Sequence, residues 1–119
     1  MSLRCLVVDD SRAFLAAAAE FLERDGVTVA GVASTAEEAI SRAAALQPDV
    51  ILVDIMLGPD SGFDLVRRLL DEPLGRPTII LMSTHAEADF GELIVASGAA
   101  CFLPKAELSA AAIRGIAET

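Results

Sequence analysis

Short apolar segments alternate with longer amphipathic segments along the chain, five times in all. The apolar segments have the length of β-strands and lie near residues 3–8, 27–33, 50–54, 78–82 and 101–103. The third and fourth are continuously apolar instead of alternating with polar residues, which is typical of strands covered on both faces. This pattern predicts a buried parallel sheet with a helix after each strand.

The amphipathic segments carry start and stop signals for helices. We expect helices near residues 11–25, 35–47, 63–70, 88–97 and 108–117. Ser11 can cap the first helix, and Thr35 with Glu38 forms a capping box at the start of the second. Five strand–helix units in 119 residues predict one domain, residues 1–119, with an α/β fold. We expect a doubly wound, five-stranded parallel sheet of order 2-1-3-4-5, a flavodoxin-like three-layer sandwich.

Charged residues stand where the predicted strands end. Asp9 and Asp10 follow the first strand, Asp54 ends the third, and Lys105 follows the fifth. In a parallel sheet of this order, the carboxyl ends of strands one and three flank the point at which ligands bind. Three carboxylates in a small site need a compensating cation, and a hard divalent ion together with one ammonium would balance them. The sequence therefore predicts a Mg2+ site suited to chemistry on a phosphoryl group.

The net charge, the length of the apolar runs and the cysteines limit the partners and the cellular compartment that we expect for this protein. The formal net charge of -9 argues against direct binding of this domain to nucleic acid phosphates. No apolar run approaches the roughly 20 residues that span a bilayer, and no signal peptide is visible, so we expect a cytoplasmic protein without membrane contact. Cys5 and Cys101 fall on the first and last strands, about 14 Å apart and too far for a disulfide. We expect two buried free thiols.

The charged residues occur in the order and spacing of a known family. The acidic pair ends Leu6-Val7-Val8-Asp9-Asp10, Asp54 stands alone, Ser83 follows the fourth strand and Lys105 follows the fifth. Across essentially its whole length, the chain resembles the receiver domain of two-component response regulators, including receivers of the chemotaxis type. The resemblance implies a phosphorylation-dependent switch in a two-component pathway or phosphorelay.

The resemblance also implies roles for the residues that match the family pattern. Asp54 would be the phosphoacceptor, taking a phosphoryl group from the phosphohistidine of a sensor histidine kinase or a phosphotransfer protein. Lys105 would neutralise the transferred group, and Ser83 would donate a hydrogen bond to it. Ser83, Thr84 and Phe102 would form the switch. Phe102 could be simple core packing, but strand alternation puts it on the face opposite Cys101, which favours a near-surface ring that turns inward on phosphorylation.

The same resemblance implies a ligand set for Mg2+. Asp10, Asp54 and the backbone carbonyl of Met56 would coordinate the ion directly. Asp9 would act through a bound water. Phosphoryl transfer needs positioning and charge neutralisation more than covalent help from the protein, so this set is sufficient.

Three positions depart from the family pattern. Lys105 precedes Ala106 instead of a proline in a cis bond. A cis bond to a non-proline residue costs about 3 kcal/mol, which favours a trans bond and a differently shaped loop, although the sequence leaves both isomers open. Gly58-Pro59 replaces the usual proline four residues past the phosphoacceptor, although Gly62 keeps its place. Thr84 replaces the usual small residue. His85, two residues past Ser83, would lie near the mouth of the site.

Four functions are compatible with these residues to different degrees. The leading one is the phosphorylated switch, whose regulated face would be the fourth helix, fifth strand and fifth helix, in contact with a second copy or an output domain. The alternatives are a phosphorylation-independent pseudo-receiver, an aspartyl-phosphate phosphatase and a flavin carrier. The phosphatase would need an aspartate where Met56 stands, and the chain has no tryptophan or tyrosine to stack on a flavin. We expect no enzymatic function beyond self-catalysed phosphotransfer and dephosphorylation.

Overall fold

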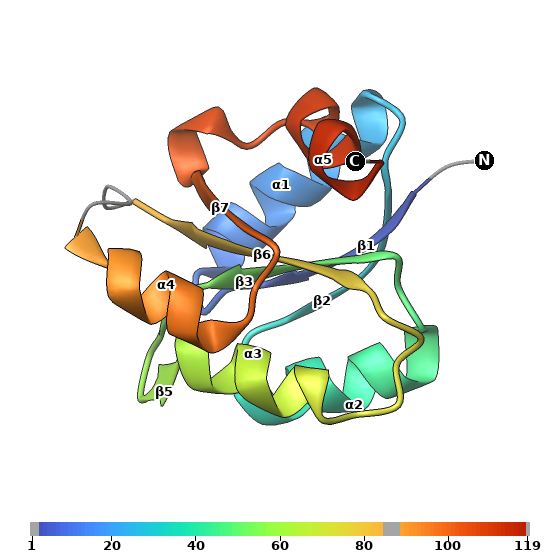
Figure 1. The fold of residues 1–119 in the computed structure, drawn as a ribbon. Coiled ribbons are helices and arrows are strands. Elements are labelled where there is room, and N and C mark those ends of the chain that lie inside the picture. The colour runs from blue at the N-terminus through green and yellow to red at the C-terminus, as the bar shows by residue number, and fades with distance from the viewer. Residues whose placement is uncertain (1–2, 85–88, 119) are drawn as a thin grey trace.

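A five-stranded parallel sheet forms the middle of the computed structural model, which describes residues 3–84 and 89–118 (Figure 1). Its spatial order is β2-β1-β3-β6-β7, which is the predicted order with the strands numbered along the chain. The strands are β1 Arg4–Val8, β2 Thr28–Ala33, β3 Val50–Asp54, β6 Thr78–Ser83 and β7 Cys101–Pro104. The predicted strand order and doubly wound fold are confirmed.

Helices cover both faces of the sheet and complete the three-layer sandwich (Figure 1). Helices α1 and α5 lie on one face, and α2, α3 and α4 lie on the other. Their bounds are α1 Arg12–Arg24, α2 Ala36–Leu46, α3 Gly62–Leu70, α4 Gly91–Ser97 and α5 Ala110–Ala117. Arg114 of α5 donates a hydrogen bond to the carbonyl of Asp25 at 2.6 Å, which ties α5 to the end of α1.

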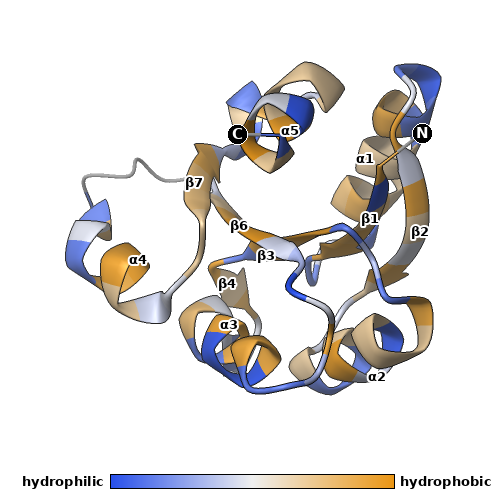
Figure 2. Ribbon diagram, turned by 45° about the vertical axis from the view of Figure 1, so that its right-hand side comes forward, coloured by the Kyte–Doolittle hydropathy of each residue, from blue (hydrophilic) through white to orange (hydrophobic). Residues whose placement is uncertain are grey.

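The core is divided by the sheet into two clusters. Leu6 and Val8 of β1 pack in the cluster under α2 and α3, whereas Cys5 and Val7 pack in the cluster under α1 and α5. All four side chains are fully buried, so β1 is apolar on both faces. Figure 2 shows hydrophobic residues along the strands of the sheet. This two-sided burial is the reason for the continuously apolar strand sequences.

The caps of the first two helices follow the predicted residues, with one shift. The Ser11 hydroxyl accepts the N–H of Phe14 at 3.2 Å, and the Thr35 hydroxyl accepts the N–H of Glu38 at 3.1 Å. The Glu38 carboxylate, however, accepts the N–H of Ser34 at 2.8 Å, one residue before the helix cap. The reciprocal half of the capping box is therefore displaced by one residue.

A short hairpin that the sequence reading missed follows the third strand. Strands β4 Met56–Leu57 and β5 Asp60–Ser61 pair in antiparallel fashion around Gly58-Pro59. Gly58 has a φ of 61°, which suits the first central position of a two-residue hairpin turn. The Gly-Pro pair, read earlier only as a departure from the family pattern, was the available signal for this hairpin.

The C-terminal third differs in detail from the prediction. Helix α4 begins at Gly91, and its predicted start at residue 88 lies outside the described residues. Helix α5 begins at Ala110 rather than at 108, because a 3-10 turn, η2 Lys105–Glu107, comes first and Ser109 caps the helix. The described part of the chain contains no cis peptide bond, so the bond after Lys105 is trans.

Two further expectations are tested by burial and helix length. Cys5 and Cys101 are free thiols, but only Cys5 is buried; Cys101 is half-buried because β7 is an edge strand. Within the described ranges, no helix is long and apolar enough to cross a membrane.

Candidate functional site

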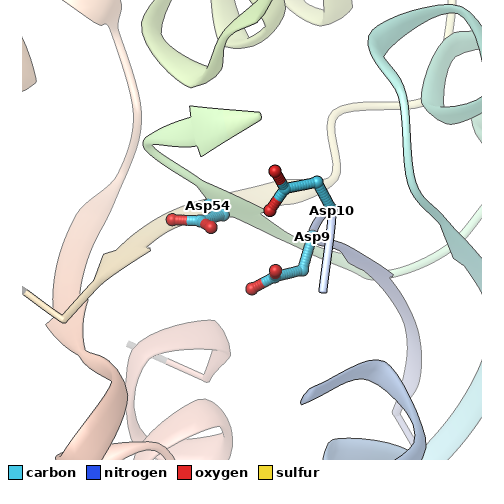
Figure 3. Close-up of side chains that lie close together, drawn as sticks. All are labelled: Asp9, Asp10 and Asp54. Carbon is cyan, nitrogen blue, oxygen red and sulfur yellow. The ribbon is translucent and has the colours of Figure 1, made fainter. Parts of the chain in front are cut away.

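The predicted acidic residues meet at the carboxyl edge of the sheet. Val8 of β1 pairs with Val53 of β3, so Asp9 and Asp54 follow side by side on neighbouring strands. One carboxylate oxygen from each of Asp9, Asp10 and Asp54 lies within 4.8 Å of the others (Figure 3). The sheet register therefore assembles the acidic cluster.

Asp54 forms the floor of the site and is only 6% exposed. Its Oδ1 accepts the N–H of Met56 at 3.2 Å, and its Oδ2 accepts a hydrogen bond from Lys105 Nζ at 3.3 Å. The main-chain contact holds the carboxylate against the hairpin that follows β3, while the ammonium holds it toward β7. Oδ1 of Asp54 thus faces the hairpin, and Oδ2 faces β7.

The two adjacent aspartates occupy different environments. Asp9 is fully buried, its Oδ1 accepts the N–H of Ser11 at 2.8 Å, and its Oδ2 lies 2.5 Å from Lys105 Nζ. Among the described residues, that buried Oδ2 has no hydrogen-bond partner, so the ion pair with the Lys105 ammonium compensates its burial. Asp10 is exposed at the rim, where Gly58 of the hairpin approaches its carboxylate.

Burial and charge shift the acid–base equilibria of the site. Burial raises the pKa of Asp54, and the neighbouring Asp9 carboxylate raises it further, while Lys105 and the Met56 N–H act in the opposite direction. Burial alone lowers the pKa of Lys105, but contact with Asp9 and the charge of Asp54 raise it above its ordinary value. Lys105 is therefore a cation at neutral pH, and this one ammonium faces three carboxyl groups.

The Lys105 ammonium also contacts an aromatic residue, Phe14, that the sequence analysis did not assign to the site. The Lys105 side chain is 15% exposed, and its Nζ lies 4.3 Å from the centroid of the Phe14 ring in α1. The sequence could have indicated Phe14 through its position. Phe14 lies in the first turn of α1, which begins just after Asp10, and this turn lies at the same edge of the sheet as the acidic cluster.

The predicted switch residues lie beside this cluster. Ser83 ends β6, is buried, and pairs in register with Pro104, directly before Lys105. Thr84 is exposed. Phe102 is only 6% exposed and packs in the core cluster that contains Ile94 of α4, so the expectation of a near-surface ring is wrong. The reason is that α4 covers this face of the edge strand. His85 lies outside the described residues.

Gly62 at the start of α3 presses against the backbone that carries the phosphoacceptor candidate. A Cβ at this position would lie 2.1 Å from the Asp54 carbonyl oxygen and 2.7 Å from the Ile55 Cα. The Gly62 N–H also donates to the Ile55 carbonyl at 2.8 Å. A side chain at residue 62 is therefore excluded by the close approach of two main-chain segments.

Comparison with known proteins agrees with this arrangement. Residues 5–115 match the family described as the response regulator receiver domain. A two-component response regulator of the LuxR family from Aurantimonas sp. SI85-9A1 superposes with a TM-score of 0.86 at 25% identity, over 99% of this chain and 86% of that one. A response regulator from Burkholderia pseudomallei, solved with a phosphorylated aspartic acid, a calcium ion and citrate, is 31% identical, with a TM-score of 0.82 over 99% of this chain and 68% of that one.

A curated relative corrects one expectation. The protein-glutamate methylesterase/protein-glutamine glutaminase of Idiomarina loihiensis is 38% identical over 109 residues, which cover 88% of this chain and 28% of that protein. Relatives of this kind are named as enzymes, so the expectation of no enzymatic function beyond phosphotransfer is contradicted. The chain spans about 28% of their length, and for this reason its own motifs carried no sign of the named activity.

The matched residues, the parallel sheet order and the acidic cluster with its lysine lead to the same result. The chain belongs to the response regulator receiver domain family.

Proposed function

We propose that this domain, residues 1–119, is a switch that accepts a phosphoryl group on Asp54. The observation that carries the proposal is the environment of that carboxylate. It is nearly buried, lies between the Met56 N–H and the Lys105 ammonium, and has the Asp9 and Asp10 carboxylates beside it. These are the groups that position an incoming phosphoryl group and neutralise its charge.

The residues present fit a Mg2+ ion. All donors of the cluster are hard carboxylate oxygens, and among the described residues the buried Oδ2 of Asp9 has one ammonium to compensate it. We assign Asp10, Asp54 and the backbone carbonyl of Met56 as direct ligands, and Asp9 as a ligand through water. When bound, the ion would neutralise charge on the phosphoryl oxygens. The Burkholderia relative was solved with a calcium ion, which supports a divalent cation in this family.

The proposed step is a transfer between two nucleophiles. An Asp54 carboxylate oxygen forms a bond to phosphorus while the bond from phosphorus to the histidine nitrogen of the donor breaks, and that nitrogen keeps the electron pair. The product is an acyl phosphate on Asp54. Lys105 pairs with a phosphoryl oxygen, and the Ser83 hydroxyl donates a hydrogen bond to another. The phosphorylated aspartic acid of the Burkholderia relative supports this product.

Two alternatives are less well supported. A pseudo-receiver would not need the intact acidic cluster with its half-buried lysine. An aspartyl-phosphate phosphatase would need an acid–base group two residues past Asp54, where the Met56 side chain is apolar and 58% exposed. The site therefore favours a phosphoacceptor over an aspartyl-phosphate phosphatase.

We propose that phosphorylation is read out on the face formed by α4, β7 and α5. Lys105 lies between β7 and α5, so a change in its partners reaches these elements directly. Leu93 and Val95 of α4 are exposed, by 52% and 82%, and offer apolar surface for a partner. The relatives suggest an output domain of the methylesterase type, with a second copy of this chain as the alternative. A histidine kinase partner and the free thiols fit a cytoplasmic setting.

Intact mass spectrometry tests the proposal. The parent, incubated with acetyl phosphate and Mg2+, should gain one phosphoryl group, and Asp54→Asn should gain none. Asp71→Asn is a matched control, because Asp71 is exposed at the far end of α3. It should label like the parent. Undiminished labelling of Asp54→Asn would overturn the assignment.

A further inference from the structure

Phe14 gives the site an aromatic wall next to its only lysine. The Lys105 Nζ lies 4.3 Å from the ring centroid, well within the range of a cation–π contact. Phe14 is half-buried and packs against the core cluster under α1 and α5, and the Lys105 side chain is 15% exposed. The contact therefore joins two side chains that are already confined, rather than two free surface groups.

The ring holds the ammonium in a way that oxygen ligands cannot. An ammonium has three N–H donors, and the Asp9 and Asp54 carboxylates lie 2.5 Å and 3.3 Å from it. A ring face attracts the cation without an acceptor lone pair, so it leaves a donor for another oxygen. A polar side chain at residue 14 would compete for that donor, and an aliphatic one would not attract the charge.

We propose that Phe14 is a positioning residue for phosphoryl transfer, which rests on the function proposed above. Phosphorylation changes the charge on Asp54, and Lys105 must then turn from that carboxylate to a phosphoryl oxygen. The ring is uncharged and does not take part in this exchange, so its attraction for Nζ persists through it. Phe14 thereby keeps a long, flexible side chain in place while its oxygen partners change.

The experiment is a double-mutant cycle of the parent, Phe14→Leu, Lys105→Met and the double variant. Leucine keeps an apolar side chain of similar bulk but removes the ring. The first readout is the labelling rate with acetyl phosphate and Mg2+. The second is the NMR shift of the Lys105 Hε protons without phosphodonor, which the ring current moves upfield when Nζ lies over the ring face. Phe14→Tyr, which keeps a ring face, serves as the conservative variant.

The expected result is that Phe14→Leu labels about threefold more slowly than the parent, the size set by a partly exposed cation–π contact. It should also lose the upfield Hε shift. Phe14→Tyr should keep both. In the Lys105→Met background, Phe14→Leu should cause no further slowing, because the cation that the ring holds is gone.

Equal slowing by Phe14→Leu in both backgrounds would overturn the proposal, since a merely structural role would not depend on the lysine. Unchanged rates in the parent background would overturn it as well. If Phe14→Leu does not fold by circular dichroism, Phe14→Met enters the same cycle with the same criteria. Failure of the parent to label Asp54 would instead refute the proposed function, so the two failures are distinguishable.

Discussion

Gly62→Ala is the smallest change that tests how the fold builds the site. The added Cβ would lie 2.1 Å from the Asp54 carbonyl oxygen, 2.7 Å from the Ile55 Cα and 2.9 Å from the Asp54 carbonyl carbon. All three are main-chain atoms, so no flexible side chain can turn away. The first turn of α3 and the end of β3 must separate by at least about 1 Å to restore ordinary contact distances.

The magnitude follows from two opposed terms. Alanine is favoured over glycine in a helix by at most about 1 kcal/mol. Overpacking against a rigid neighbour costs typically 1–3 kcal/mol, and contacts with main-chain atoms alone place this site at the upper end, about 3 kcal/mol. The net expectation is a loss of about 2 kcal/mol in the free energy of unfolding, together with weaker Mg2+ binding, because the displaced backbone carries Asp54.

Urea unfolding followed by circular dichroism measures this loss as a lower midpoint at unchanged slope. Gly115→Ala is the matched control. Gly115 lies inside α5, and a Cβ there meets no atom within 4 Å. The same substitution should therefore stabilise the protein at residue 115, by about 0.5–1 kcal/mol. If Gly62→Ala is as stable as the parent or as Gly115→Ala, close packing of α3 on the phosphoacceptor backbone is refuted.

Three further predictions follow from the site and its surroundings. Asp10→Asn should weaken Mg2+ binding strongly in calorimetric titration and slightly stabilise the metal-free protein, because one of three repelling carboxylates is neutralised; unchanged affinity would exclude Asp10 as a ligand. Burial raises the pKa of Cys5 from 9.0 to about 12. As pH rises, the Cys5 thiol therefore ionises in the unfolded chain before it ionises in the folded protein. The contribution of Cys5 to the free energy of unfolding is complete below pH 9 and should fall by about 1.4 kcal/mol per pH unit between pH 9 and pH 12. The stability difference between the parent and Cys5→Ala should shrink accordingly from pH 8 to pH 10, and a constant difference would contradict the burial argument. Binding of beryllofluoride, a phosphoryl mimic, should change hydrogen exchange in β7 and α5; changes confined to β1 and the β4–β5 hairpin would refute the proposed output face.

Sequence periodicity was sufficient for the architecture of this domain. The continuously apolar strands had to be covered on both faces, and strands joined by helices had to run parallel. Strands one and three are neighbours in the predicted order, and parallel neighbours end at the same edge of the sheet, so the sequence alone predicts that Asp9 and Asp54 meet. The register, with Val8 paired to Val53, confirms that step. Local capping was also readable, because Ser11 precedes α1 in the position that its hydroxyl requires.

Only the tertiary structure decided which side chains touch across elements. Phe102 was expected near the surface, but α4 covers its face of the sheet and buries it. Phe14 was not assigned to the site, yet the packing of α1 on the sheet brings its ring to Lys105. Strand and helix periods specify the face on which a residue lies. They do not specify how far a neighbouring element approaches that face, and this distance decides burial, rotamer and contact.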